Sequence, residues 1–262
     1  MDRVIKSAAL AAGKVILRYF KKEMSIGYKK SSHKVLVTKA DIEAQNVVRK
    51  TVVTEMAKKG FPEKEIGFLG EENLDIKGKH TFIVDPLDGT TNFASGIPYF
   101  SVSIAYVENN VIKAGAIYNP ATGEYFSATL GRGSYLGKKR LKIVSKPLKE
   151  SVVNTFFNSP KKIYRRQLDI YGKLFPKVRA FRNFGSASCD IAAVSLNRFN
   201  LYINGHSFIW DVAAAKLIIE EAGGSIVDWQ GQPLNLDLNQ PEKEYTIIAG
   251  HPLLTKKVLS FI

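Results

Sequence analysis

The sequence has little cysteine and no long apolar run, and both shortages narrow what the protein can be. Among its 262 residues Cys189 is the single cysteine, so no disulfide can form within the chain. A lone cysteine suits a reducing compartment, and we expect a cytoplasmic protein in which Cys189 serves packing rather than nucleophilic chemistry. No apolar stretch approaches the roughly 20 residues that cross a bilayer, so we expect no membrane partner. Lys6, Lys14 and Arg18 interrupt the apolar N-terminal residues, which favours an amphipathic helix over a signal peptide.

Acidic residues are also in short supply. The chain has 24 Asp and Glu against 38 Lys and Arg, a formal net charge of +14. Such a balance attracts nucleic acids or smaller polyanions such as sugar phosphates, and it also favours solubility. The sequence contains no zinc-ligand spacing, RNA-binding aromatic motif or long basic tail. We therefore do not expect nucleic acid to be the physiological partner.

Apolar periodicity and turn residues predict an α/β protein, with an α+β first half at 1–150 and an alternating second half at 151–262. Residues 25–38 are basic and polar and favour a loop or a hairpin. Helices are predicted at 2–21, 41–59, 162–174, 186–196, 211–222 and the C-terminus, and strands near 66–69, 80–85, 101–107, 111–118, 124–128, 141–144, 152–157, 178–183, 199–204 and 244–249.

The most informative segment is FIVDPLDGTTNF, residues 82–93. A β-branched, apolar strand runs into Asp85, and Pro86 fixes the backbone and removes a donor, so the strand is predicted to stop there. Asp88 and Gly89 follow in a carboxylate-rich loop of the kind that suits Mg²⁺. The competing interpretation is a capped helix start, because Asp and Thr are good caps.

Two further segments place acidic residues at element ends. Asp211 precedes a run of helix formers that Gly223 and Gly224 terminate, so it lies at a helix N-terminus, where it could simply be the cap. Glu71 and Glu72 follow an apolar patch and a glycine. The competing interpretation for these two glutamates is a solvated loop.

Together the three segments resemble the signatures of the inositol monophosphatase family, which comprises Mg²⁺-dependent sugar phosphatases. The matching residues are Gly70-Glu71-Glu72, Asp85-Pro86-Leu87-Asp88-Gly89-Thr90-Thr91 and Trp210-Asp211, in the family's order and over essentially the whole chain. The resemblance implies a five-layer αβαβα sandwich of the sugar phosphatase type, with the site between its halves. It also implies a homodimer.

The resemblance assigns metal ligands. It implies that Glu71, Asp85 and the Leu87 carbonyl bind one Mg²⁺, that Asp85, Asp88 and Asp211 bind a second, and that a weaker third lies beside Glu71. About two or three ions, for which Mn²⁺ can substitute, would balance the repulsion among these carboxylates and a phosphate dianion.

It also assigns catalytic and phosphate-binding roles. The attacking water would be held by Glu71 and the Thr90 hydroxyl, and Asp41 would hydrogen-bond to Thr90; Asp41 could equally cap the helix that it opens. Gly89 and Thr90 would present backbone N–H groups to the phosphate. Lys30 matches a loop lysine that reaches the site, although a solvated charge is the competing interpretation.

Residues of the second half would complete the substrate pocket. Asn204 stands where inositol-specific relatives carry a glutamate, and Val35 replaces a polar residue of the mobile-loop motif. The other candidates are Gly185, Ser186 and Ala187 in the sugar pocket, and Arg182 and Arg198 for a second phosphate. Either arginine could instead be a surface or dimer-contact residue, and Ser186 could cap a helix.

The expected reaction is hydrolysis of inositol 1-phosphate, fructose 1,6-bisphosphate or both. An adenosine 3′,5′-bisphosphate or NADP phosphatase would use the same metal core. A regulatory protein of RNA or transcription complexes is a third interpretation, since some bacterial relatives act in this way. The intact Glu71, Asp85, Asp88, Thr90 and Asp211 set favours a working enzyme.

Overall fold

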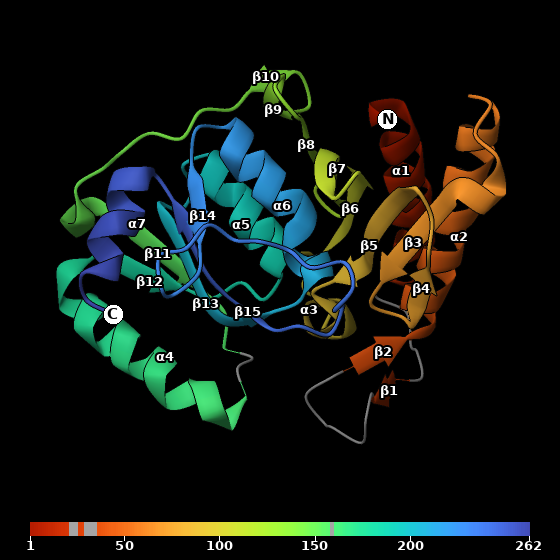
Figure 1. The fold of residues 1–262 in the computed structure, drawn as a ribbon. Helices are drawn as coiled ribbons and strands as arrows, with labels where there is room; N and C mark the ends of the chain where they lie inside the picture. The colour runs from red at the N-terminus through yellow and green to blue at the C-terminus, as the bar shows by residue number, and fades with distance from the viewer. Residues whose placement is uncertain (21–25, 29–35, 158–159) are drawn as a thin grey trace.

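The structure, a computed structural model, describes residues 1–20, 26–28, 36–157 and 160–262. Its elements stack in the five αβαβα layers that the resemblance implies (Figure 1). The three helical layers are α1 (Asp2–Tyr19) with α2 (Lys39–Ala57), α5 (Ala187–Ser195) with α6 (Ile209–Glu221), and α4 (Lys161–Leu174) with α7 (Pro252–Leu259). Within the described residues, no helix is both long and apolar enough to cross a membrane.

The larger sheet is built from the first half of the chain in the order β10-β9-β8-β7-β6-β5-β3-β4. Its strands are β3 (Ile66–Gly70), β4 (Leu74–Ile76), β5 (His80–Asp88), β6 (Ser101–Glu108), β7 (Val111–Asn119), β8 (Glu124–Thr129), β9 (Gly133–Leu136) and β10 (Lys139–Arg140). Within this sheet, β3 and β5 pair in parallel, and the other pairs of described strands are antiparallel. The predicted hairpin of β6 and β7 is confirmed, and Asn109 and Asn110 take the positive φ angles that its tight turn demands.

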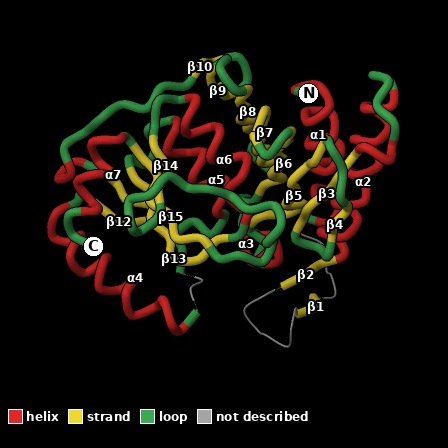
Figure 2. The backbone as a smooth tube through the Cα atoms, viewed as in Figure 1, coloured by secondary structure: helices red, strands yellow, loops and turns green. Residues whose placement is uncertain are grey.

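The smaller sheet comes from the second half and has the order β12-β11-β13-β15-β14. Its strands are β11 (Val152–Thr155), β12 (Ala180–Arg182), β13 (Leu201–Ser207), β14 (Ser225–Val227) and β15 (Tyr245–Gly250). The two sheets have no strand in common, and the division of the chain at residue 150 stays a prediction. The secondary-structure view shows α5 and α6 lying between the sheets (Figure 2).

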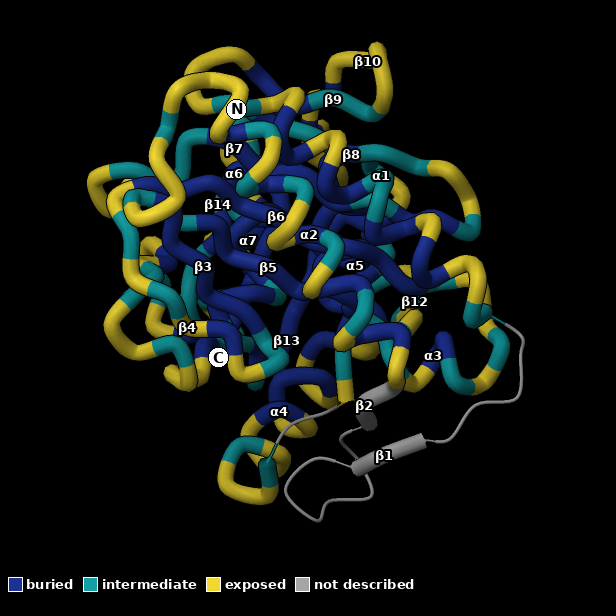
Figure 3. Tube along the Cα trace, turned by 90° about the vertical axis from the view of Figure 1, so that its right-hand side faces the viewer, coloured by how far each residue is buried: buried dark blue, intermediate teal, exposed yellow. Residues whose placement is uncertain are grey.

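The middle layer explains why both halves share a core. Helix α5 is buried along its whole length, and α6 is buried on nearly every side, so neither is amphipathic. One hydrophobic cluster joins residues of the larger sheet, such as Ile83, to Ile191 of α5 and Tyr202 of β13. The burial view shows β5, α5 and β13 as buried tube at the centre (Figure 3). The site residues at the ends of these elements therefore have rigid support.

Short elements connect the layers at the edges. They are β1 (Ile26–Tyr28), β2 (Leu36–Thr38), α3 (Thr90–Ala94) and the 3₁₀ turns η2 (Glu63–Glu65), η3 (Leu148–Glu150) and η4 (Phe175–Lys177). Strands β1 and β2 pair antiparallel, with Ile26 opposite Thr38, as the hairpin interpretation of 25–38 requires.

The strand predicted at 141–144 is wrong. Leu141 and Ile143 are buried while the residues between and after them are exposed, so the sequence alternates as a strand does. The backbone nevertheless pairs with no single neighbour. Leu141 N–H donates to the Ser134 carbonyl at 2.8 Å, whereas Ile143 N–H donates to the Ala222 carbonyl at 2.9 Å. Strands β4, β9, β10 and β14 were not predicted, and each has at most four residues.

Candidate active site

The turn after β5 organises the candidate site. Pairing of β5 with β6 shifts between Asp85 and Asp88 and then resumes, so the strand continues past the predicted stop at Asp85. Pro86 offers no N–H there, and the Leu87 N–H instead donates to Asp85 Oδ1 at 3.0 Å. Both aspartates are buried, with 2% and 7% of their surface exposed. Two carboxylates are thereby held at one end of the larger sheet.

Gly89 changes the chain direction from β5 into α3. Its φ of +92° is a left-handed conformation that side chains rarely adopt. A Cβ at this position would also lie 3.1 Å from the Tyr99 carbonyl oxygen and 3.2 Å from that of Gly185. Glycine is therefore required where the first half of the chain approaches the second.

Asp41 and Thr90 meet as expected from the resemblance. Asp41 lies in the first turn of α2 and is fully buried. The Thr90 hydroxyl lies 3.3 Å from Asp41 Oδ1 and 3.0 Å from the Leu87 carbonyl oxygen, and it can donate to either. Its single proton is directed toward protein acceptors, which leaves its oxygen to accept from a water or a ligand. That Asp41 tunes this hydroxyl for catalysis stays a prediction.

Glu71 joins the site through strand pairing. Gly70 of β3 lies opposite Val84 of β5 in the parallel ladder, and the Glu71 N–H donates to the Val84 carbonyl at 3.4 Å. A Cβ on Gly70 would lie 2.8 Å from that oxygen, so only glycine permits the approach. This pairing carries Glu71 to the strand end where Asp85 stands, and the Gln45 amide of α2 donates to the Glu72 carbonyl at 2.9 Å.

Asp211 reaches the site on the N-terminus of α6. Asp211 is the third residue of α6 and not its N-cap, which is Phe208; its Oδ2 accepts the Phe208 N–H at 2.7 Å and so reaches back to the cap. The Ser103 hydroxyl donates to the Trp210 carbonyl at 3.3 Å, and Ser103 lies opposite Asp85 in the β5–β6 ladder. The start of α6 is thus attached beside Asp85.

Asp88 packs against the start of α5. Its carboxylate is turned to the N-terminus of α5, where it accepts the Ala187 N–H at 3.0 Å, the Ser188 N–H at 2.8 Å and the Ser186 hydroxyl at 2.5 Å. Ser186 and Ala187 were predicted to line the sugar pocket. Donors of both residues reach Asp88, and Gly185, at φ +81°, packs against Asn92. That this segment also lines a sugar pocket stays a prediction.

The predicted metal ligands fit Mg²⁺ in chemical type, since all of them offer oxygen atoms. Their side chains do not converge on one point. Within the described ranges, no three His, Cys, Asp or Glu side chains are grouped closely enough to hold an ion. The elements that carry Glu71, Asp85, Asp88 and Asp211 do meet. The orientation of Asp88 toward α5 is the clearest departure from a convergent arrangement.

The other four residues predicted to contact the substrate lie in different environments. Arg198 forms a bidentate ion pair with Glu124, which fits the surface alternative, and its role toward a second phosphate stays a prediction. Asn204 is fully buried, and both of its amide hydrogens are used locally, by the His206 carbonyl at 2.7 Å and Ser207 Oγ at 2.9 Å. Arg182 is exposed at the end of β12 and donates to the neighbouring Phe181 carbonyl. Lys30, like Val35, lies outside the described residues.

A buried polar pair behind Asp88 was not predicted. The Tyr99 hydroxyl donates to Asp190 Oδ1 of α5 at 2.8 Å, and burial raises the pKa of Asp190 to about 8. Burial also raises the pKa of the Cys189 thiol to about 12, which agrees with a packing role. The sequence did hint at this pair, because Asp190 is a carboxylate inside the apolar helix predicted at 186–196. It could not identify Tyr99 as the partner.

The raised pKa of Asp190 predicts a pH dependence of stability. Between about pH 4 and 8 the folded state keeps a proton that the unfolded chain has released, so stability falls as pH rises, by at most about 1.4 kcal/mol per pH unit, and levels off above pH 8. Asp190→Asn cannot ionise and should gain stability relative to the wild type from pH 5 to pH 8. Urea unfolding at both pH values measures this, with the exposed Asp75→Asn as control. Parallel pH profiles for Asp190→Asn and the wild type would refute the assignment.

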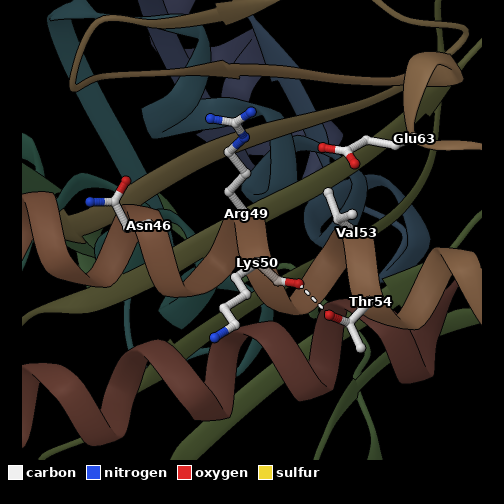
Figure 4. A pocket seen from close by; sticks show the side chains of 6 residues that line it. All are labelled: Asn46, Arg49, Lys50, Val53, Thr54 and Glu63. Atoms are coloured by element: carbon white, nitrogen blue, oxygen red, sulfur yellow. Dashed lines mark hydrogen bonds between the residues drawn. The ribbon is translucent and has the colours of Figure 1, made fainter.

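A shallow hollow on α2 is separate from these residues. Asn46, Arg49, Lys50, Val53 and Thr54 line it together with Glu63 of η2 (Figure 4). No predicted site residue takes part. The candidate site is therefore defined by the meeting of β3, β5, α2, α5 and α6 rather than by this hollow.

The chain is similar to other proteins over 79% to 99% of its length. An inositol-1-monophosphatase of Rhizobium meliloti is 33% identical over 99% of this chain and 94% of its own length. A Nus factor SuhB of Xylella fastidiosa is 33% identical over 95% and 89%. A fructose-1,6-bisphosphatase/inositol-1-monophosphatase of Thermotoga maritima is 33% identical over 79% and 77%.

The fold also matches solved structures over nearly the whole chain. The crystal structure of extragenic suppressor protein suhB from Bartonella henselae superimposes with a TM-score of 0.87 and 32% identity, covering 99% of this chain and 96% of that one. The family model described as the inositol monophosphatase family matches residues 1–260. Because this model covers nearly the whole chain and relatives of the same family are 33% identical, the chain belongs to the inositol monophosphatase family.

Proposed function

We propose that this phosphatase hydrolyses phosphate monoesters of sugars or inositol in a Mg²⁺-dependent reaction at the β5 turn. Two contacts carry the proposal. The Thr90 hydroxyl hydrogen-bonds to Asp41 of α2, and Asp85 lies opposite Ser103, whose hydroxyl donates to the Trp210 carbonyl at the α6 start that bears Asp211. These elements bring acidic, hydroxyl and backbone N–H groups to one place, which phosphate hydrolysis requires.

The metal would be held by Glu71, Asp85, Asp88, Asp211 and the Leu87 carbonyl oxygen, all of which supply the oxygen donors that Mg²⁺ prefers. When bound, Mg²⁺ supplies positive charge that neutralises the phosphate dianion and lowers the pKa of water. The inositol monophosphatase family is generally Mg²⁺-dependent, which supports Mg²⁺ as the metal of this protein.

The protein's own groups would orient the reactants. The Thr90 hydroxyl, directed at Asp41 or Leu87, would accept a hydrogen bond from the attacking water, and Glu71 would take its proton. The first helical hydrogen bond of α3 runs from Phe93 N–H to the Gly89 carbonyl at 3.0 Å. The N–H groups of Gly89 and Thr90 precede it and have no partner within the helix, so they would bind phosphate oxygens.

For the substrate, we propose a dual preference for fructose 1,6-bisphosphate and inositol 1-phosphate. The net charge of +14 favours a bisphosphate, and a neutral Asn204 adds no carboxylate that would select inositol hydroxyls. The Thermotoga relative bears both activities in its name. We further propose a homodimer, which light scattering of the purified protein would test.

A substrate panel tests this function. Purified protein should release phosphate from fructose 1,6-bisphosphate with a kcat/KM at least equal to that for inositol 1-phosphate, in Mg²⁺ or Mn²⁺ and not in excess EDTA. Adenosine 3′,5′-bisphosphate and NADP are the discriminating substrates, because each needs room for a purine. If either nucleotide is preferred by more than about tenfold, in the range where specific contacts decide selectivity, the nucleotide phosphatase takes the place of the sugar phosphatase.

A protein that releases no phosphate from any substrate, yet binds transcription-complex components, would favour the regulatory interpretation, which the name Nus factor SuhB of one relative motivates. That outcome would remove the catalytic proposal altogether. The same panel therefore separates the three interpretations.

A further inference from the structure

Hydrogen-bond donors of Ser186, Ala187 and Ser188 converge on the Asp88 carboxylate. Its Oδ2 accepts the Ser186 hydroxyl at 2.5 Å, the Ser188 N–H at 2.8 Å and the Ser188 hydroxyl at 2.5 Å. Its Oδ1 accepts one hydrogen bond, from the Ala187 N–H at 3.0 Å. The two oxygens of this carboxylate therefore differ in the number of hydrogen bonds that they accept from the protein.

Ser101 completes this group from the other half of the chain. It lies opposite Asp88 in the β5–β6 ladder, and its hydroxyl is 2.8 Å from that of Ser188 and 3.4 Å from Asp88 Oδ2. Ser101, Ser186 and Ser188 are completely buried. Buried hydroxyls and carboxylates of this kind hold one arrangement, because any rotation leaves a polar atom without its partner.

This arrangement has a consequence for metal binding. A carboxylate oxygen has about two lone-pair directions in its plane, and three short donors already use those of Oδ2. Only Oδ1, with a single N–H donor, retains capacity for an ion. Asp88 would therefore act as a ligand through one oxygen, and its orientation would depend on α5, which starts 99 residues further along the chain.

Building on the proposed function, we propose that Ser188, supported by Ser101, is a positioning residue that fixes the Asp88 carboxylate so that Oδ1 alone faces the metal. Hydrogen-bonding partners of a ligating carboxylate typically change metal affinity about 10- to 100-fold when removed. Helix α5, from the second half of the chain, would in this way determine how tightly Asp88, from the first half, binds the metal.

The chain offers a matched control on the same helix. Ser195 is also a completely buried serine of α5, and its hydroxyl donates to the Ala192 carbonyl at 2.6 Å, away from Asp88. Ser188→Ala and Ser195→Ala therefore remove the same atom from equally buried positions. A role in helix packing alone would affect both variants alike.

The test is Mn²⁺ binding by titration calorimetry to the wild type and both variants, with thermal unfolding of each metal-free protein. We expect Ser188→Ala to weaken Mn²⁺ binding about tenfold, with kcat at saturating Mg²⁺ within about twofold of the wild type. Ser195→Ala should bind Mn²⁺ as the wild type does. If Ser188→Ala does not fold, Ser101→Ala removes only the supporting hydroxyl and should weaken binding by about two- to threefold.

A double variant shows whether the effect passes through Asp88. In an Asp88→Asn background, Ser188→Ala should cause no further loss of Mn²⁺ affinity. Wild-type affinity in Ser188→Ala, or an equal loss in Ser195→Ala, would overturn the positioning role while leaving the phosphatase proposal intact. A wild-type protein that neither binds Mn²⁺ nor releases phosphate would overturn the proposed function, and this inference with it.

Discussion

Asp85→Asn is expected to lower phosphate release at least about a hundredfold, which corresponds to about 2.7 kcal/mol of lost transition-state stabilisation. Asp85 is the residue proposed to be shared between metal ions, and its charge is what the substitution removes. The fold should survive, because an amide oxygen can still accept the Leu87 N–H that now bonds to Oδ1. The measurement is kcat/KM at saturating Mg²⁺, together with circular dichroism of the purified variant.

The matched control for that experiment is Asp75→Asn. Asp75 is an exposed acid of β4 in the same sheet, paired with Lys77 at 3.0 Å, and its replacement should leave kcat/KM unchanged. Exposed pairs of this kind contribute little to stability. Near-normal turnover in a folded Asp85→Asn protein would place the reaction elsewhere on the molecule.

Thr90→Val is expected to lower kcat about a hundredfold with a smaller effect on KM. The substitution keeps the shape and removes the hydroxyl proposed to orient the attacking water, and such positioned groups typically contribute about 10²–10⁴-fold. It also removes a donor from the fully buried Asp41, so we expect a loss of about 1–3 kcal/mol in the free energy of unfolding. Steady-state kinetics and urea unfolding measure the two effects.

Thr91→Val controls for a change of threonine on the same short helix. Thr91 is exposed, whereas the Thr90 hydroxyl contacts Asp41 and Leu87. We expect wild-type kcat and stability from Thr91→Val. Equal kinetics for the two variants would remove Thr90 from the proposed chemistry, even if Asp85 retained its role.

The sequence predicted those parts of the molecule that depend on local pattern. Residues 82–93 combine a β-branched strand with Gly89, whose positive φ turns the chain, although β5 runs on to Asp88 and does not stop before Pro86. The Asn109-Asn110 turn likewise specifies its hairpin. Helices ended within about two residues of their predicted limits because caps and periodicity are local signals.

Contacts between distant segments could not be predicted in the same way. Asp88 meets Ser186, 98 positions away, and Arg198 meets Glu124, 74 positions away. Hydrogen-bonding capacity can be read from a residue type, but its partner is decided by how the layers pack. Resemblance located the acidic residues, whereas the use of Asp88 by α5 needed the fold.

The alternating segment 141–144 shows a second limit. Burial at every other residue is the pattern of a strand, and Leu141 and Ile143 satisfy it. A strand also needs one continuous partner, and this segment instead bonds successively to β9, to Ala222 and to the side chain of Asn197. Periodicity reports which face is buried and does not report the hydrogen-bonding partner.

The most direct test of the proposed site is a crystal structure of the protein soaked with Mn²⁺ and inorganic phosphate, with the ions located by their anomalous scattering. The proposal predicts ions bonded to Asp85 and to Asp88 Oδ1, and phosphate at the N–H groups of Gly89 and Thr90. Ions bound only elsewhere, for example at Glu63 beside the α2 hollow, or an absence of ions at Asp85 under conditions where the protein releases phosphate, would contradict it.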